Sequence, residues 1–203
     1  MIKTIIFDFG DVFINLDKKG AMANALNLFG IEEFDQDMIA TNIKFEVGSI
    51  SNFEFISFYK NKFPFLNEAE IIDAWNFILK DFPMYRFEFL KTLRKEQKHR
   101  LILLSNTNTL HIDWVKANVP FYESFKNSFD AFYLSQEIHL RKPDTDTFDF
   151  VLTENKINPN ECLFIDDTKE NTDAAESMGL NVWNIDETKE DVVDVFTIKK
   201  ELF

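Results

Sequence analysis

Acidic side chains follow two apolar runs that lie near opposite ends of the chain. Asp8 follows the run 2–7, and the pair Asp166-Asp167 follows the run 163–165. Carboxylates that meet at one place make a site for a hard cation such as Mg²⁺, and a carboxylate beside that cation can act as a nucleophile. The two positions therefore predict metal-assisted chemistry, although a single aspartate after a strand is more often a cap or turn residue.

Residues with phosphate-binding chemistry follow a third apolar run. Ser105, Asn106 and Thr107 come directly after residues 101–104. A hydroxyl and free backbone N–H groups at the start of a helix form a cradle for an anion. The same residue types are common in turns and helix caps, and the motif alone favours that structural explanation.

A lysine precedes a proline in the segment Arg141-Lys142-Pro143. Proline favours an extended conformation in the residue before it and often begins a helix, so the Lys142 ammonium could reach both a phosphoryl group and a carboxylate. Taken alone, such a lysine is more often a surface cation. Asp166 and Asp167 are too close for both to ionise cheaply without a cation or hydrogen-bond donors, and helix capping accounts for only one of them.

The elements that must position these residues alternate between strand and helix. Runs rich in apolar residues without strict alternation, typical of buried parallel strands, occur at 2–7, 101–104, 132–134, 163–165 and 180–183. Helices are predicted near 87–96, 109–117, after Pro143, near 171–178 and from about 188 onwards. The pattern predicts a doubly wound, Rossmann-like α/β fold with a parallel sheet. The carboxyl edge of that sheet would gather the polar residues into one crevice.

The long segment between the first two strands has helical periodicity. One helix face is predicted from Met22, Ala25, Leu26 and Phe29, and two further apolar stripes lie within 55–63 and 71–79. Residues that cap helices stand beside these stripes: Gly30, the pair Ser51 and Glu54, and Asn67. We therefore expect a helical-bundle cap domain of residues 16–84, inserted into an α/β core domain of residues 1–15 and 85–203.

Composition narrows the class of protein. The chain of 203 residues is 45% hydrophobic and contains 24 phenylalanines, which predicts a large phenylalanine-rich core. A net charge of −13 without a long basic cluster argues against nucleic acid as a partner. The chain has a single cysteine, Cys162, and it shows neither a signal-peptide pattern nor an apolar stretch of membrane-spanning length. These features predict a soluble cytoplasmic protein without membrane contact. We expect a monomer or a homodimer.

Taken in order, the motifs at Asp8, Ser105, Lys142 and Asp166-Asp167 resemble the haloacid dehalogenase (HAD) superfamily, whose members are mostly phosphatases. The resemblance covers essentially the whole chain, including a helical cap after the first strand. Further segments resemble the subgroup that contains bacterial alpha-D-glucose-1-phosphate phosphatase: 46–51, 105–108 with His111 and Trp114, 133–136, 141–143 and 164–167.

The resemblance implies a HAD-like fold, a nucleophile and a metal cofactor. Asp8 would form an aspartyl-phosphate, and Mg²⁺ would be held by Asp8, the backbone carbonyl of Gly10 and Asp167. Asp166 would be a further ligand, direct or through water. Octahedral Mg²⁺ keeps several waters, which suits so few protein ligands.

The resemblance also implies a phosphate site. Ser105, with Asn106 beside it, would bind the phosphoryl oxygens, and Lys142 would neutralise charge and orient Asp8. Phosphoryl transfer needs mainly positioning and charge stabilisation, which these residues provide.

One position departs from the family pattern. Most phosphatases of the superfamily have an aspartate two residues after the nucleophile as general acid and base, whereas this chain has Gly10, as the named subgroup does. Asp11 is one residue further on, and on an extended chain its side chain would point the other way. His111, which titrates near neutrality when unperturbed, could assist, although a packing role is favoured. Glu46, at the end of a cap helix, could meet a sugar hydroxyl but is more simply an exposed glutamate.

The sequence thus predicts a Mg²⁺-dependent phosphatase that acts on a small phosphomonoester, for example a sugar phosphate such as glucose 1-phosphate. Gly10 motivates one alternative, a phosphate-binding scaffold domain with low turnover. A second alternative is a 2-haloacid dehalogenase, which works without Mg²⁺ and uses an arginine to hold halide. No arginine stands just after Asp8, and the Asp166-Asp167 pair favours the metal enzyme.

Overall fold

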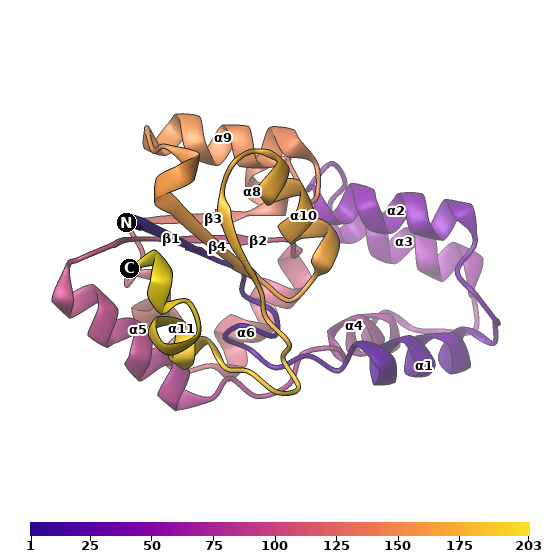
Figure 1. Ribbon diagram of the computed structural model, residues 1–203. Helices are drawn as coiled ribbons and strands as arrows, with labels where there is room; N and C mark the ends of the chain where they lie inside the picture. Colours follow the sequence, from indigo (N-terminus) through magenta and orange to yellow (C-terminus); the bar gives the residue numbers. More distant parts are fainter.

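A five-stranded parallel sheet forms the centre of the computed structural model, which describes residues 1–203 (Figure 1). The strand order is β3-β2-β1-β4-β5, and each neighbouring pair is parallel. The strands are β1 Thr4–Phe7, β2 Arg100–Ser105, β3 Ala131–Leu134, β4 Cys162–Asp166 and β5 Asn181–Asn184. The doubly wound α/β prediction is confirmed. Because the chain order reverses between β1 and β4, a ligand crevice is expected at their carboxyl ends.

Helices cover both faces of the sheet. One face packs against α9 (Thr145–Asn155) and α10 (Lys169–Ser177), and the other against α5 (Met84–Glu96), α6 (Thr109–Asn118), α7 (Tyr122–Lys126) and α11 (Val195–Ile198) (Figure 1). Alternate residues of β1 serve the two layers, since Ile5 and Phe7 join one apolar cluster and Ile6 joins the other. In the first cluster, Phe13 packs against Phe125 with ring centroids 5.1 Å apart, which illustrates the predicted phenylalanine-rich core.

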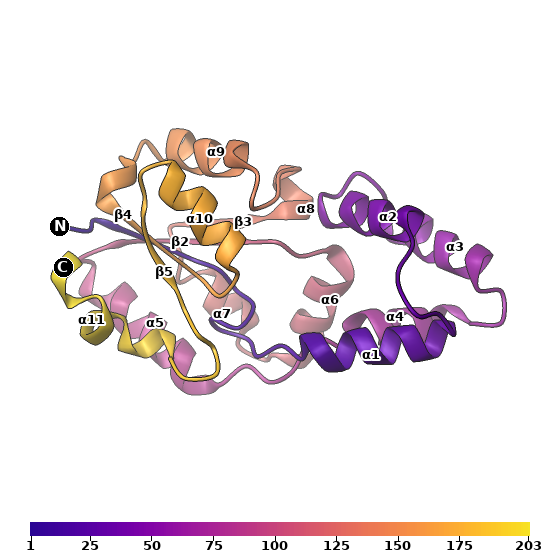
Figure 2. The same cartoon turned by 45° about the vertical axis from the view of Figure 1, so that its right-hand side comes forward.

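Four helices between β1 and α5 form a helical insertion beside the carboxyl edge of the sheet (Figures 1 and 2). They are α1 (Lys18–Phe29), α2 (Gln36–Glu46), α3 (Asn52–Lys62) and α4 (Glu68–Asn76), and most of their buried residues form a separate apolar cluster. The predicted caps are present. Gly30 ends α1 in the left-handed conformation, Ser51 forms a capping box with Glu54, and Asn67 forms one with Glu70.

Two sequence predictions about these elements need correction, and two short helices were not predicted. Met22 was predicted on the packing face of its helix but is 52% exposed. Only Ala25 and Phe29 of that stripe are buried. The tail forms no single helix, since α11 has four residues and stands between two short 3₁₀ turns. Helix α7 follows a turn and helix α8 (Ser135–Ile138) follows β3 directly, and both are too short for periodicity to reveal. None of the helices is long and apolar enough to cross a membrane.

The turn after α2 contacts the sheet domain directly. Gly48 has φ +66°, and a Cβ placed on it would lie 2.2 Å from the carbonyl oxygen of Gln136. The hydroxyl of Ser135 lies 2.7 Å from the carbonyl oxygen of Glu46, and His139 Nδ1 lies 2.8 Å from the carbonyl oxygen of Val47. We call these contacts between residues 46–48 and 135–141 the α2 tether. They hold the insertion in place at a point separate from its two chain connections.

Candidate active site

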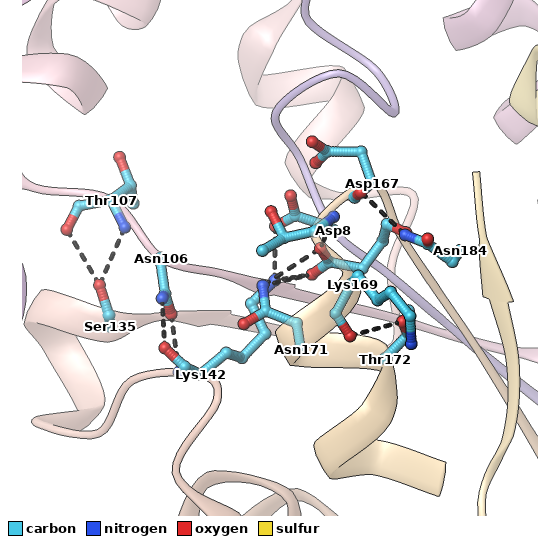
Figure 3. Close-up of polar contacts among 12 residues, drawn as sticks. Asp8, Asn106, Thr107, Ser135, Lys142, Asp167, Lys169, Asn171, Thr172 and Asn184 are labelled. Atoms are coloured by element: carbon cyan, nitrogen blue, oxygen red, sulfur yellow. Dashed lines mark hydrogen bonds and ion pairs between the residues drawn. The ribbon is translucent and has the colours of Figure 1, made fainter. Parts of the chain in front are cut away.

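The structure brings three predicted residues together at the carboxyl ends of β1 and β4. Asp8 follows β1 directly, and its N–H donates to the carbonyl of Ile165 at 2.9 Å. Lys142 Nζ lies 2.7 Å from Asp8 Oδ1 (Figure 3). It also lies 2.6 Å from Asp166 Oδ2. Lys142 is 1% exposed and Asp166 is fully buried. The lysine is therefore a buried cation between two carboxylates and not a surface charge.

Asp166 has hydrogen-bond partners on both oxygens. Besides Lys142, it accepts from the Thr168 N–H at 2.8 Å and from Asn171 Nδ2, which lies 3.1 and 3.0 Å from its two oxygens. Sequence reasoning missed Asn171. Its place in the first turn of α10, five residues after Asp166, was the available signal. Asp166 is therefore held rigidly by donors within the protein.

Asp8, Asp166 and Asp167 form a group suited to a hard cation. Their oxygens lie within 4.8 Å of one another. Asp167 makes an ion pair with Lys18 at the start of α1, and Lys18 Nζ also lies 2.9 Å from Asp11 Oδ2. An ammonium thus already faces Asp167 in this structure, and Lys18 is a second residue that sequence reasoning missed. All three carboxylates provide the hard oxygen ligands that Mg²⁺ prefers.

Burial and the neighbouring charges shift the pKa values of Asp8, Asp167 and Lys142. Burial raises the pKa of Asp8 to about 7; Asp166 and Asp167 add to the rise, and Lys142 opposes it. Burial also raises the pKa of Asp167, against the effect of Lys18. Although burial alone lowers the pKa of Lys142, Asp166 and Asp8 outweigh it and raise the pKa above its ordinary value. A cation in this cluster would favour the ionised carboxylates.

Two of the predicted phosphate-binding residues occupy the end of β2. Ser105 is its last residue and is 3% exposed. The Asn106 side chain is occupied by the Lys142 backbone, donating to the carbonyl at 2.7 Å and accepting from the N–H at 2.9 Å (Figure 3). Asn106 therefore fixes the segment that carries Lys142. Both residues line a cavity of about 290 Å³ that Gly10 also lines.

Position 10 carries no acid, and the structure shows what an added side chain would meet there. A Cβ on Gly10 would lie 2.6 Å from Cδ1 of Leu16, the far end of a flexible side chain that would have to shift. The expectation of an extended chain at Asp11 is wrong, because Asp11 has φ +54° in a tight turn. Its Oδ1 accepts from the Leu16 N–H at 2.8 Å, and its other oxygen faces Lys18.

His111 and Glu46 both have protein partners. Burial lowers the pKa of His111 from its unperturbed value to about 4, which agrees with the favoured packing role. Its Nε2 lies 3.1 Å from the carbonyl of Trp75 and must donate, which leaves Nδ1 to accept from Asn108. Glu46 Oε1 lies 2.6 Å from Arg141 Nε, so this side chain pairs across the α2 tether and is only partly exposed.

Comparisons with known proteins agree with this arrangement. The sequence profile of the haloacid dehalogenase-like hydrolase family matches residues 2–179. D-ribitol-5-phosphate phosphatase from Bacteroides thetaiotaomicron is 28% identical over 193 residues, covering 90% of this chain and 91% of the relative.

Solved structures of a HAD family enzyme from Bacteroides thetaiotaomicron are similar to the whole chain. A magnesium complex has a TM-score of 0.84 and 31% identity, and the match covers 96% of this chain and 98% of that one. The wild-type protein in complex with magnesium and inorganic phosphate has a TM-score of 0.81 and 32% identity, covering 94% and 97%.

Proposed function

The chain belongs to the haloacid dehalogenase-like hydrolase family and is a phosphatase, and we propose that it hydrolyses a small phosphomonoester through an aspartyl-phosphate on Asp8. The single observation that carries the proposal is the placement of Lys142 between Asp8 and Asp166, beside Asp167 and at the point where strand order reverses. The family resemblance drawn from the sequence is confirmed, while the glucose-1-phosphate subgroup stays a prediction.

The proposed reaction has two in-line steps. An oxygen of Asp8 attacks phosphorus, the bond from phosphorus to the ester oxygen breaks, and the alcohol leaves with a proton. Water then attacks phosphorus, the bond to Asp8 breaks, and inorganic phosphate leaves. Lys142, 2.7 Å from Asp8, fixes the nucleophile and offsets negative charge, and Ser105 would donate its hydroxyl to a phosphoryl oxygen.

Mg²⁺ is the cofactor. When bound, it offsets charge on the phosphoryl oxygens and favours the ionised form of Asp8. We propose that Asp8, Asp167 and the carbonyl of Gly10 hold it. Both oxygens of Asp166 already accept hydrogen bonds, which favours contact through a water molecule. Lys18 faces Asp167, so metal binding at that oxygen requires its ammonium to move aside.

The proton for the leaving alcohol has no obvious donor on the chain. Gly10 has no acidic side chain, His111 is neutral with both ring nitrogens occupied, and Asp11 is held by Lys18. We propose that water or the substrate itself supplies the proton. Absence of a general acid costs on the order of 10²- to 10⁴-fold in rate, least for esters with good leaving groups.

The helical insertion, as a cap domain over the sheet domain, would contact the alcohol part of the substrate. Sugar and sugar-alcohol phosphates, including glucose 1-phosphate, are the first substrates to assay, because a relative is named for D-ribitol 5-phosphate. These assays test whether a phosphomonoester with an alcohol of this size is hydrolysed. They leave the chemical class of the preferred alcohol open.

The test is phosphate release from a panel of sugar, alkyl and aryl phosphates, with Mg²⁺ and with EDTA. Wild type should turn over only with Mg²⁺, and Asp8→Asn should be inactive because an amide is a poor nucleophile. Asp173→Asn, an exposed carboxylate on α10, is the matched control and should keep wild-type rates. Rapid acid quenching should trap phosphate on wild type alone.

The alternative of a phosphate-binding scaffold rests on Gly10. Binding of Mg²⁺ and phosphate by calorimetry, without release of product from any ester, would support it. A rate unchanged in Asp8→Asn would reject the proposed mechanism.

A further inference from the structure

An apolar groove of about 670 Å³ lies within the helical insertion. Residues of α1 and α2 line it, and Figure 2 shows how these two helices lie in the insertion. Ten of its 17 lining residues are hydrophobic. Three of them stay well exposed: Met22 at 52%, Ile39 at 49% and Ile43 at 42%. Apolar side chains grouped in a concave surface release free energy when a ligand removes them from water.

The groove continues into the proposed catalytic cavity. Lys18 and Arg141 line both the groove and a cavity of about 410 Å³ that contains Asp8, Lys142 and Asp167. A second route joins them, because five residues line both the groove and the cavity at Ser105: Asn42, Glu46, Trp75, Ile78 and His111. A molecule with its phosphoryl group at Asp8 would therefore place its other end in the groove.

The walls of the groove are held in place by contacts to the sheet domain. The α2 tether fixes one wall at Gly48, where the backbone of Gln136 leaves no space for a side chain. His111 on α6 contacts the carbonyl of Trp75 on α4 and fixes another wall. The groove is thus largely formed before a ligand binds, which lowers the ordering cost of binding.

Most polar groups of the groove lie toward its catalytic end and have protein partners, whereas Glu32 and Glu33 are exposed at the α1–α2 connection and make no side-chain hydrogen bond or ion pair. Glu46 pairs with Arg141, His111 uses both ring nitrogens, and the Asn42 carbonyl oxygen accepts from Tyr59. The amide nitrogen of Asn42, the two terminal nitrogens of Arg141 and Oε2 of Glu46 make no hydrogen bond within the protein. A sugar with four or five hydroxyl groups would find these partners only at the ends of the groove, whereas an aliphatic or aromatic group would bury the apolar surface between them.

We propose that this groove binds the alcohol part of the substrate, and that the preferred substrates are phosphomonoesters whose alcohol carries an aliphatic or aromatic group. The inference rests on the phosphatase function proposed above and extends it to the non-reacting end of the substrate. Contacts to the non-reacting end that are equally strong in the ground state and the transition state lower KM and leave kcat nearly unchanged, and we expect this for the groove.

The test is kcat/KM for n-alkyl phosphates from ethyl to octyl, with a hexitol 6-phosphate as the polar match of hexyl phosphate. We expect kcat/KM to rise roughly two- to fourfold per added methylene group until the groove is full, mainly through KM. Hexyl phosphate should exceed the hexitol phosphate. A flat series, with the hexitol phosphate preferred, would overturn the inference.

Variants locate the effect. Met22→Ser combined with Ile43→Ser should reduce the dependence on chain length to less than half of its wild-type slope on a logarithmic scale. Phe53→Ser is the matched control, because Phe53 is 78% exposed on α3 and does not line the groove. It should keep the wild-type slope. An unchanged slope in the double variant, together with a changed oligomeric state by sedimentation, would assign the groove to contact between copies of this chain and overturn the inference.

Binding without turnover separates this inference from the phosphatase function. Asp8→Asn should bind hexyl phosphate more tightly than the hexitol phosphate in calorimetry, by at least about tenfold. That preference without hydrolysis of any ester by wild type would support the groove and reject the phosphatase mechanism. Hydrolysis by wild type without that binding preference would support the phosphatase function and reject the groove as the site for apolar alcohols.

Discussion

The floor of the site, formed by Asp8, Ser105, Lys142 and Asp166, is buried, whereas the groove is lined by exposed apolar side chains. In the floor, Lys142 is 1% exposed, Asp166 is fully buried, and their charged atoms lie within hydrogen-bond distance. In the groove, Met22 and Ile43 remain 52% and 42% exposed. The difference reflects what each region must do before a ligand arrives. Buried charges are costly unless paired, so the floor must be complete in the free protein. Apolar side chains can stay exposed in the free protein, because removing them from water when a ligand binds releases free energy. Chemistry and substrate choice thus depend on different forces in adjacent regions.

The largest effect should follow from breaking the floor. Lys142→Met leaves Asp8 and Asp166 buried together without their cation, which should lower the free energy of unfolding by roughly 3 to 5 kcal/mol. The rate should fall at least about 10²- to 10³-fold, because charge stabilisation at the phosphoryl group is lost. Urea unfolding and phosphate release measure the two effects.

Lys169→Met is the control for that change. Lys169 also pairs with a carboxylate, Asp173, but on the exposed surface of α10. Its replacement should leave stability and rate unchanged, since exposed pairs contribute little. Equal losses in the two variants would contradict the contrast between buried and exposed lysines.

An intermediate effect should follow at the α2 tether, which connects the two regions. Gly48→Ala places a Cβ 2.2 Å from the Gln136 carbonyl at φ +66°, so we expect a loss of roughly 2 to 4 kcal/mol in unfolding free energy. Gly30→Ala isolates the backbone contribution, because Gly30 has φ +67° with nothing within 4 Å of the added Cβ. It should lose only about 1 kcal/mol. Equal losses in chemical denaturation would mean that the close approach at Gly48 is unimportant.

Most of the floor could be predicted from the sequence, because Asp8, Ser105 and Asp166 each stand at the end of an apolar run. Lys142 does not, and the sequence alone favoured a surface position for it, whereas it is buried. Strand ends of a parallel sheet meet at one edge, so Asp8, Ser105 and Asp166 had to come together once the strands were recognised. The capping box of Ser51 and Glu54 was also predicted, because the partners lie three residues apart. For the box at Asn67, the cap residue was predicted and its partner Glu70 was not.

The groove and the tether could not be predicted in the same way. Met22 fits the spacing of a packing face, yet it is exposed because no other helix covers that position. Gly48 reads as an ordinary turn residue, and only the approach of Gln136, far away in sequence, makes its lack of a side chain necessary. Periodicity predicts which face of a helix is apolar and not which neighbour will cover it.

The smallest effect should be measured at His111, which lines both the groove and the cavity at Ser105. Its pKa is lowered by burial to about 4, so the unfolded chain binds a proton at higher pH than the folded protein does. Stability from this group is therefore present above about pH 6.5 and is lost as pH falls toward 4, by roughly 2 kcal/mol between pH 7 and pH 4.5. His111→Gln removes that titration, so the variant should lose about that much less stability than wild type over the same range in urea unfolding. An identical acid dependence would show that His111 is solvated and can protonate, which would place a proton donor between floor and groove and remove the need for water or substrate to supply the proton.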